Sequence, residues 1–119
     1  LGGHLARVNA VRIFNDNIHL SGSYDRTVRV HDIRVPRFPV QILSEAGDSV
    51  ECIDVGTESG LIAVGSVDGH VRVYDIRAGQ LSTDALGGPV VELALGRDAQ
   101  YYAAAVLPGT VRLVDLQGD

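Results

Sequence analysis

The sequence predicts an all-β fold built from copies of one small unit. A segment occurs twice and then a third time in altered form: residues 21–34 read SGSYDRTVRVHDIR, residues 64–77 read VGSVDGHVRVYDIR, and residues 104–116 read AAVLPGTVRLVDL. The aspartates that close these segments are 43 and 40 residues apart. A period near 40 residues indicates stacked copies of one structural unit. Apolar residues alternate with the period of a strand, and no stretch of the sequence shows the apolar stripe of a helix.

Each copy is expected to contain four strands, except the third, which ends after three. The expected strands are 8–14, 18–24, 27–33 and 39–43 in the first copy, 50–55, 61–67, 70–76 and 80–86 in the second, and 90–95, 101–107 and 110–116 in the third. The copies divide the chain into the units 1–46, 47–87 and 88–119.

Turn residues separate the expected strands. Tyr24-Asp25-Arg26 and Asp68-Gly69 lie between the second and third strands of their copies. Asp-Gly pairs favour tight turns whose twist matches that of the flanking strands. Asn15-Asp16-Asn17, Glu58-Ser59-Gly60 and Gly96-Arg97-Asp98 lie between the first and second strands. Glycine and Asx residues tolerate the left-handed conformations that such turns require, so these positions mark the strand ends.

The first copy resembles a known repeat. Gly3-His4, a strand, the pattern Ser-Gly-Ser-x-Asp and the pattern Val-Arg-Val-x-Asp follow one another in residues 3–32. This order resembles the WD40 repeat of β-propellers, in which four strands form each blade. The resemblance implies about three blades of a seven-bladed ring. Because propellers close with four to eight blades, we expect the sequence to be a piece of a longer ring.

The resemblance also implies a buried hydrogen-bond network in each blade. In the family this network joins a histidine, a serine of the second strand, the aspartate of the following turn and a tryptophan of the third strand. The matching residues of the first blade are His4, Ser21, Asp25 and His31, with His31 in place of tryptophan. We expect His4 and His31 to form a hydrogen-bonded pair rather than to bind a ligand.

The network is expected to weaken along the chain. In the second blade Asp68 and Tyr74 match the pattern, and Val64 stands in place of the serine. In the third blade Pro108 and Val114 replace the aspartate and the tryptophan. We therefore expect the third blade to depend on apolar packing alone.

In propellers of this type the loops at one rim of the ring tend to contact partners. The corresponding residues are Arg7, Asn9, Tyr24 and Arg26 in the first blade, Asp48, Glu51, Val67 and His70 in the second, and Gly88, Glu92 and Leu107 in the third. Arginine and tyrosine are enriched in the energetically dominant parts of protein interfaces. The alternative interpretation of these residues is a solvated rim without a partner.

A longer stretch carries a more specific resemblance. Residues 35–41 (VPRFPVQ), 44–50 (SEAGDSV) and 63–81 (AVGSVDGHVRVYDIRAGQL) resemble, in this order, the middle blades of the mitogen-activated protein kinase organiser family. This family implies a non-enzymatic scaffold whose partners are kinase-cascade proteins or splicing components. An alternative is a peptide-reading or ubiquitin-ligase substrate-receptor propeller, to which Arg7, Tyr24 and Arg26 could contribute a central pocket. A third alternative is an enzyme or a direct RNA binder.

Composition argues against nucleic acid as a direct ligand. The net charge is −5, and all ten cationic residues are arginines. Strong binding to a phosphate backbone needs a basic stripe. The arginines of the third strands (Arg29, Arg72 and Arg112) are instead expected on the solvated side of each strand. No apolar run reaches the length of a membrane span and no secretory segment is visible, so we expect a cytosolic and nuclear protein without membrane contact.

The sequence shows no pattern of catalytic or metal-binding residues. The histidines His4, His19, His31 and His70 lack the spacing of a zinc site. Ser66 lacks the glycine spacing and the following helix of a nucleophile elbow. Asp32, Asp75 and Asp115 belong to different copies and are not expected to converge as paired acids do. Cys52 fits a small buried apolar residue. We therefore expect no enzyme, cofactor, metal or small-molecule substrate.

Overall fold

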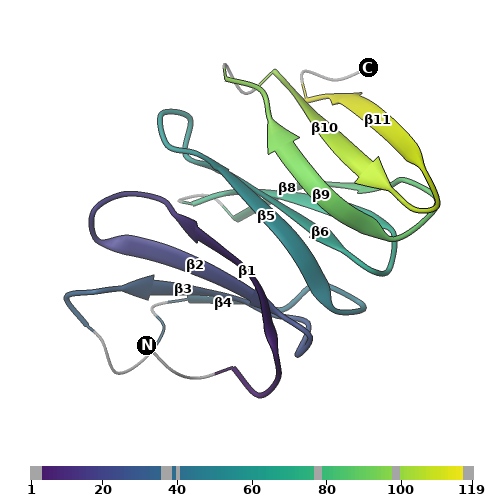
Figure 1. Ribbon diagram of the computed structural model, residues 1–119. Helices are drawn as coiled ribbons and strands as arrows, with labels where there is room; N and C mark the ends of the chain where they lie inside the picture. The colour runs from purple at the N-terminus through teal and green to yellow at the C-terminus, as the bar shows by residue number, and fades with distance from the viewer. Residues whose placement is uncertain (1–3, 36–38, 40, 77–78, 98–99, 117–119) are drawn as a thin grey trace.

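A computed structural model of the protein describes residues 4–35, 39, 41–76, 79–97 and 100–116 (Figure 1). Gly3, Asp98 and parts of the stretches 35–41 and 63–81, to which sequence patterns were assigned above, lie outside the described residues. Within the described ranges the chain forms eleven strands in three antiparallel sheets. The all-β prediction is confirmed, and the sheets contain four, four and three strands.

Strands follow one another in sequence order within each sheet. The first sheet consists of β1 (Val8–Ile13), β2 (Ile18–Ser23), β3 (Val28–Asp32) and β4 (Gln41–Leu43). The second consists of β5 (Val50–Gly56), β6 (Leu61–Ser66), β7 (His70–Asp75) and β8 (Gly79–Ala85). The third consists of β9 (Val90–Leu95), β10 (Tyr101–Val106) and β11 (Thr110–Asp115). Each sheet lies inside one of the units 1–46, 47–87 and 88–119.

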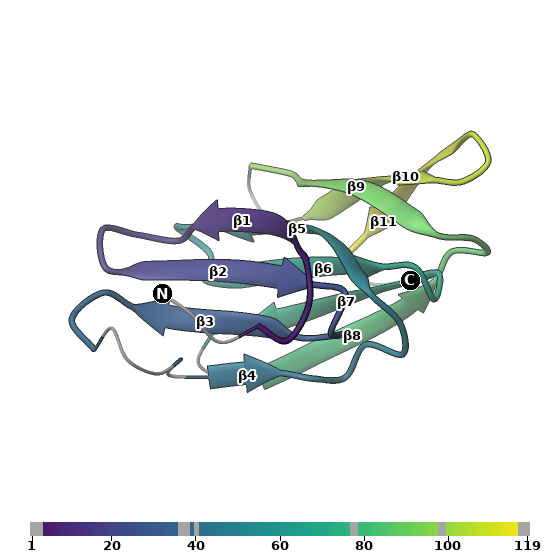
Figure 2. The ribbon, with the colours of Figure 1, turned by 60° about the horizontal axis from the view of Figure 1, so that its bottom comes forward.

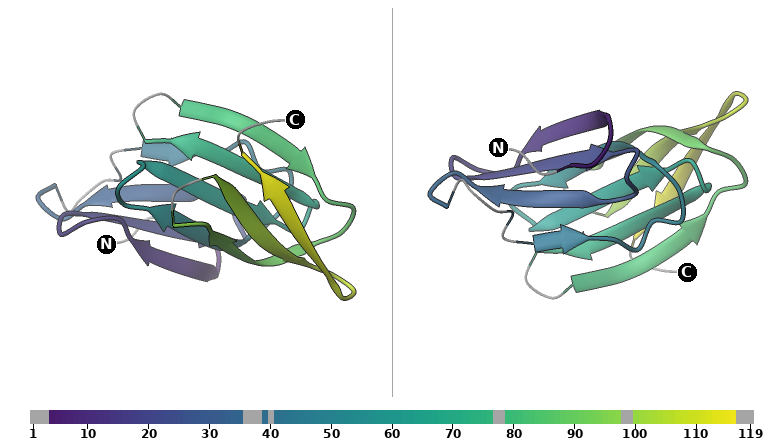
Figure 3. Two further views of the ribbon diagram at one scale, coloured as in Figure 1. Left: turned by 90° about the horizontal axis from the view of Figure 1, so that it is seen from above. Right: turned by 90° about the horizontal axis from the view of Figure 1, so that it is seen from below.

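The sheets stack face to face, as Figures 2 and 3 show from three directions. The first strands of the second and third sheets pack on the preceding sheet. Strand β5 contacts β1 and β2, and β9 contacts β5 and β6. The turns between first and second strands therefore gather at one end of the stack. The turns between second and third strands gather at the other end, which is called the β2–β3 rim below.

The second sheet is buried on both faces. Val50, Ile53, Ile62, Val64 and Tyr74 pack toward the first sheet in one apolar cluster. A second cluster toward the third sheet contains Cys52, Ala63, Val71, Val73, Val90 and Tyr102. Because successive residues of a strand face opposite sides, a strand covered on both sides reads as a continuous apolar run, as in β6.

Two equivalent glycines set how closely the sheets approach. A Cβ atom on Gly22 would lie 2.5 Å from Val50 Cγ1 of the second sheet, and one on Gly65 would lie 2.7 Å from Val90 Cγ1 of the third. Both glycines occupy the same position of a second strand, opposite the first strand of their own sheet. The third sheet has Ala105 at this position. The absence of a side chain at Gly22 and Gly65 lets the next sheet pack against the backbone.

Cys52 is buried within the second cluster, with 3% of its surface exposed. Burial, and to a lesser extent the nearby Glu92 carboxylate, raise the pKa of its thiol to about 12. The thiol is therefore neutral near pH 7, as is typical of a cysteine that packs like a small apolar residue. The described residues contain no helix that is long and apolar enough to cross a bilayer.

Candidate interaction rim and the networks that support it

The first blade contains a hydrogen-bond network around the imidazole of His4. Its Nδ1 lies 2.9 Å from Asp25 Oδ2, and its Nε2 lies 2.7 Å from Ser21 Oγ. A carboxylate can only accept, so Nδ1 carries the proton and donates to Asp25. The hydroxyl of Ser21 then donates to Nε2. The histidine thereby ties the segment before β1 to β2 and to the β2–β3 turn.

The carboxylate of Asp25 is the centre of this network. It also accepts hydrogen bonds from the amides of Leu5 and Thr27, both at 3.0 Å, and from Thr27 Oγ1 at 2.5 Å. Burial by itself would raise the pKa of Asp25. The bonds from Thr27, His4 and the Leu5 amide outweigh it and hold this pKa well below its usual range.

His31 is buried on β3, with 5% of its surface exposed, but it is not bonded to His4. Our expectation that His4 and His31 form a hydrogen-bonded pair is therefore wrong. Both ring nitrogens of His4 are already occupied by Ser21, Asp25 and Thr27. His31 instead lies opposite His19 in the β2–β3 ladder and occupies the position of the usual tryptophan.

The second blade builds the same kind of network with an arginine in place of the histidine. Asp68 accepts hydrogen bonds from the Gly47 amide at 2.9 Å, the His70 amide at 3.1 Å, Arg72 Nη2 at 3.1 Å and the hydroxyl of Ser66. Arg72 Nη1 also donates to Ser66 Oγ at 3.2 Å. Burial would raise the pKa of Asp68, but the bonds from Ser66, Arg72 and Gly47 hold it well below its usual range.

Arg72 therefore fills the role that His4 has in the first blade, and Ser66 supplies the hydroxyl that Val64 lacks. The side chain of Arg72 is buried, with only 9% of the residue exposed. Our expectation that this arginine lies on the solvated side of its strand is wrong. The equivalent Arg29 is also largely covered, but its Nη2 lies 3.9 Å from Asp25, because His4 occupies the nearer position. Arg112 is exposed, as expected, and donates to the Leu86 carbonyl at 3.3 Å.

Two buried tyrosines join neighbouring segments through their hydroxyls. Tyr74, at the usual tryptophan position, donates to Glu45 Oε1 at 2.8 Å. Tyr102 of β10 donates to Asp84 Oδ2 of the second sheet at 2.7 Å. Burial first, and then the bonded carboxylate, raise the pKa of each phenol. The third blade thus has a polar anchor, which corrects the prediction that it packs by apolar contacts alone.

The β2–β3 rim of the first blade presents an arginine stacked on a tyrosine. The guanidinium carbon of Arg7 lies 5.4 Å from the centre of the Tyr24 ring, which is a cation–π distance. Their backbones are also joined, because the Tyr24 amide donates to the Arg7 carbonyl at 3.0 Å. Ser23 Oγ donates to the same carbonyl at 2.8 Å. Both side chains are exposed, and 46% of Tyr24 is accessible.

Arg26 lies at the tip of the same turn and has a left-handed backbone, with φ of 73°. The equivalent residue of the second blade is Gly69, with φ of 85°. Arg26 is exposed, and its amide donates to the Ser23 carbonyl at 3.2 Å. The turn therefore holds a charged residue in a conformation that glycine adopts more easily.

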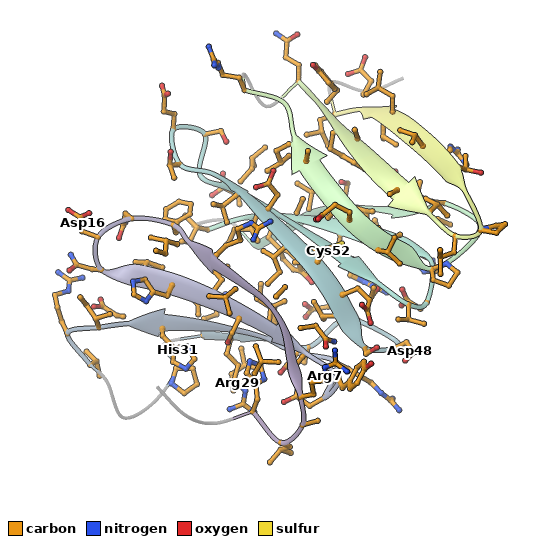
Figure 4. The ribbon with its side chains drawn as sticks, in the orientation of Figure 1. Arg7, Asp16, Arg29, His31, Asp48 and Cys52 are labelled. Carbon is orange, nitrogen blue, oxygen red and sulfur yellow. The ribbon has the colours of Figure 1, made fainter. Side chains whose placement is uncertain are left out.

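The other rim residues are bonded within the chain, exposed to solvent or partly covered. Asn9 and His70 make bonds within the chain: Asn9 Nδ2 donates to the Val50 carbonyl at 2.9 Å, and His70 Nδ1 lies 3.2 Å from the Asp68 carbonyl oxygen. Asp48 is exposed and lies at the same end of the molecule as Arg7 (Figure 4). Glu92 and Leu107 of the third blade are exposed, whereas Glu51, Val67 and Gly88 are partly covered.

Sequence reasoning missed Arg72, Ser66, Glu45, Asp84 and Tyr102 as network residues. Ser66 could have been found, because it lies only two residues before Asp68, within reach of a local hydrogen bond to its side chain. The other four could not, because their partners come from different repeats or from side-chain directions that the strand pattern does not fix. In the part of the chain that the structure describes, no three histidine, cysteine or acidic side chains come together as a metal site.

Comparisons with known proteins agree with this architecture. Residues 1–32 and 37–75 match the family described as WD domain, G-beta repeat. The chain belongs to the WD40 repeat family. This assignment accounts for the four-stranded sheets and for the aspartate-centred network of each of the first two blades.

Several relatives match part of the sequence. WD repeat domain-containing protein 83 of Rattus norvegicus is 42% identical over 77 residues, which are 65% of this chain and 24% of that protein. A guanine nucleotide-binding protein subunit beta of Zea mays is 37% identical over 79 residues (65% and 21%). Anaphase-promoting complex subunit cdc20 of Dictyostelium discoideum is 34% identical over 85 residues (71% and 17%). The chain thus spans about a quarter or less of the length of these relatives.

Proposed function

We propose that this WD40 chain is part of a non-enzymatic scaffold that brings partner proteins together. The observation that carries the proposal is the rim, where loops of successive blades are fixed by hydrogen bonds while Arg7, Tyr24, Arg26 and Asp48 stay exposed. A rigid surface loses little conformational entropy when a partner binds. Holding two partners on one ring raises their effective concentration for each other without any chemistry.

The relatives support this class of function. The names of the maize and Dictyostelium relatives describe subunits of larger assemblies. WD repeat domain-containing protein 83 is a relative at 42% identity over 77 residues, and the kinase-organiser resemblance of residues 35–81 is the basis for the partner classes proposed next. We propose partners from a kinase cascade or from a pre-mRNA splicing complex, and a location in the cytosol and the nucleus.

The scaffold is proposed to be a larger ring of which this chain supplies three blades. The outward faces of the first and third sheets support this idea, because both carry exposed apolar residues: Val11, Ile13 and Ile42 on the first, and Val91, Tyr101, Val111 and Leu113 on the third. A further blade on each face would bury them as the second sheet is buried between its neighbours.

Co-purification tests the scaffold. The full-length protein would be isolated from its own cells under cross-linking, and the proteins recovered in near-stoichiometric amounts would be identified by mass spectrometry. Splicing factors among them would favour the splicing assignment, and kinases with their adaptors would favour the signalling assignment. Recovery of the protein alone, with a size-exclusion mass of one chain, would contradict the scaffold.

A further inference from the structure

We infer that the β2–β3 rim of the first blade binds an acidic peptide segment of a partner protein. In this arrangement Arg7 and Arg26 contact carboxylates of the segment, and the exposed Tyr24 ring supports its apolar parts. The inference rests on the proposed scaffold function and deepens it, because it names the chemistry of one contact.

The first support is the absence of an internal counter-charge. Among the described residues, four arginines have a carboxylate nearby, namely Arg12 with Asp54, Arg29 with Asp25, Arg34 with Asp32, and Arg72 with Asp68. Arg97 and Arg112 have none within 4.0 Å among those residues, but neither lies at the β2–β3 rim of the first blade. Within the described ranges, neither Arg7 nor Arg26 has a carboxylate oxygen within 4.0 Å of its side-chain nitrogens. Both belong to a chain with net charge −5, in which internal acids are plentiful. Two exposed cations at one rim are thus available to an external carboxylate.

The second support is that Arg7 is already ordered. Its guanidinium lies over the Tyr24 ring, and its carbonyl accepts bonds from Ser23 and from the Tyr24 amide. A stacked guanidinium keeps its N–H groups free at the edge, where a carboxylate can accept two parallel hydrogen bonds. Stacking also reduces the side-chain entropy that would be lost on binding.

The third support is the conformation of Arg26. Its φ of 73° is unfavourable for a residue with a Cβ atom, whereas the second blade has Gly69 at the same place. Strained residues of this kind persist where they serve a function. A glycine would relax the turn but would remove the second cation from the rim.

The neighbouring blade favours a peptide over a nucleic acid. Asn9 of the first blade is bonded to the Val50 carbonyl of the second at 2.9 Å. Arg7 and Asp48 each lie two residues from this bond, or about 7 Å of strand length. Figure 4 shows Arg7 and Asp48 at the same end of the molecule. A phosphate backbone carries a negative charge at every nucleotide, so one that reached Arg7 would also bring a phosphate to the carboxylate of Asp48, which repels it. A peptide can instead present glutamates to the arginines and a lysine to Asp48.

The test measures binding of a defined probe to the purified full-length protein. The probe is a short fluorescent peptide with a run of glutamates followed by two lysines, and its binding is followed by fluorescence anisotropy at low salt. A peptide with glutamine in place of every glutamate, a phosphoserine peptide and a single-stranded oligonucleotide are measured beside it. We expect the glutamate peptide to bind most tightly, with an affinity that falls as salt is added.

Three variants assign the binding to this rim. Arg7→Glu is expected to weaken the glutamate peptide roughly fivefold or more, as loss of an exposed charge contact predicts. Arg97→Glu is the matched control, because Arg97 is an exposed arginine of the β9–β10 loop at the opposite end and the charge change is the same. Arg26→Gly removes the guanidinium and relieves the left-handed strain. It is expected to weaken binding while leaving the thermal midpoint unchanged or raised.

Several outcomes would overturn the inference. Equal loss of binding in Arg97→Glu would show that only the overall charge matters. Equal binding of the glutamine peptide, or tighter binding of the phosphoserine peptide or the oligonucleotide, would show that carboxylates are not the ligand. If the glutamate peptide does not bind but partner proteins still co-purify, the inference fails while the scaffold function stands. Peptide binding without any co-purified partner would instead contradict the scaffold.

Discussion

Replacing either turn aspartate with alanine should destabilise the protein by a similar amount. Asp25→Ala removes the acceptor for His4 and Thr27, and Asp68→Ala removes the acceptor for Ser66 and Arg72. Each buried donor left without a partner costs about 1–3 kcal/mol. The amides of Leu5 and Gly47, which also donate to these aspartates, are exposed and can bind water instead. Two buried donors for each aspartate give a loss of about 2–6 kcal/mol in both variants.

Urea unfolding of the full-length protein, followed by far-ultraviolet circular dichroism, measures these losses. Asp16→Ala is the control, because Asp16 lies exposed in the β1–β2 turn (Figure 4) and should change stability by less than about 0.5 kcal/mol. The reasoning would be refuted if Asp68→Ala cost less than half as much as Asp25→Ala. That result would mean that Arg72 does not replace the histidine of the first blade in energetic terms.

Three further predictions follow from the packing and the charges. Gly65→Ala should cost about 1–3 kcal/mol by overpacking the sheet interface, whereas Gly109→Ala, with no atom within 4 Å of the added Cβ, should be nearly neutral in the same urea assay. Tyr102→Phe should lower the free energy of unfolding by about 1 kcal/mol or more, since Asp84 loses its bonded hydroxyl; an unchanged urea midpoint would remove this residue as an anchor of the third blade. The lowered pKa values of Asp25 and Asp68 make their stabilisation complete above about pH 5; it should begin to fall as pH drops below the unfolded value of about 3.9 and be lost as pH falls through the lower folded values. A urea midpoint that stays constant from pH 7 to about pH 3 would contradict this.

The strands and turns could be predicted because they depend on local patterns. Alternation of apolar residues gave the ends of the strands to within about two residues of the structure, and glycine and Asx residues marked the turns. The repeat of Ser21 to Arg34 gave the blade and the position of Asp25 in its turn. These features depend only on the type and spacing of residues that are close together in the sequence.

The contacts of long side chains could not be predicted in the same way. Arg72 lies in a strand where a charged residue is expected to face water, yet it is buried because Asp68 balances its charge and Ser66 accepts a hydrogen bond from it. Tyr102 bonds Asp84 across 18 residues of sequence, from the third sheet to the second. Such pairs depend on how the sheets stack, which the alternation within one strand does not specify.

The sequence by itself determined an all-β chain of repeated four-stranded units with an aspartate in the second turn of the first two, because period, propensity and turn chemistry act over a few residues. The tertiary structure alone decided which side chain meets each aspartate and which rim residues stay exposed. Asn9 is fixed to the neighbouring blade, whereas Arg7 stacks on Tyr24 and faces solvent. The physical reason is that burial and counter-charge are properties of the space between sheets, and that space exists only once the blades have packed.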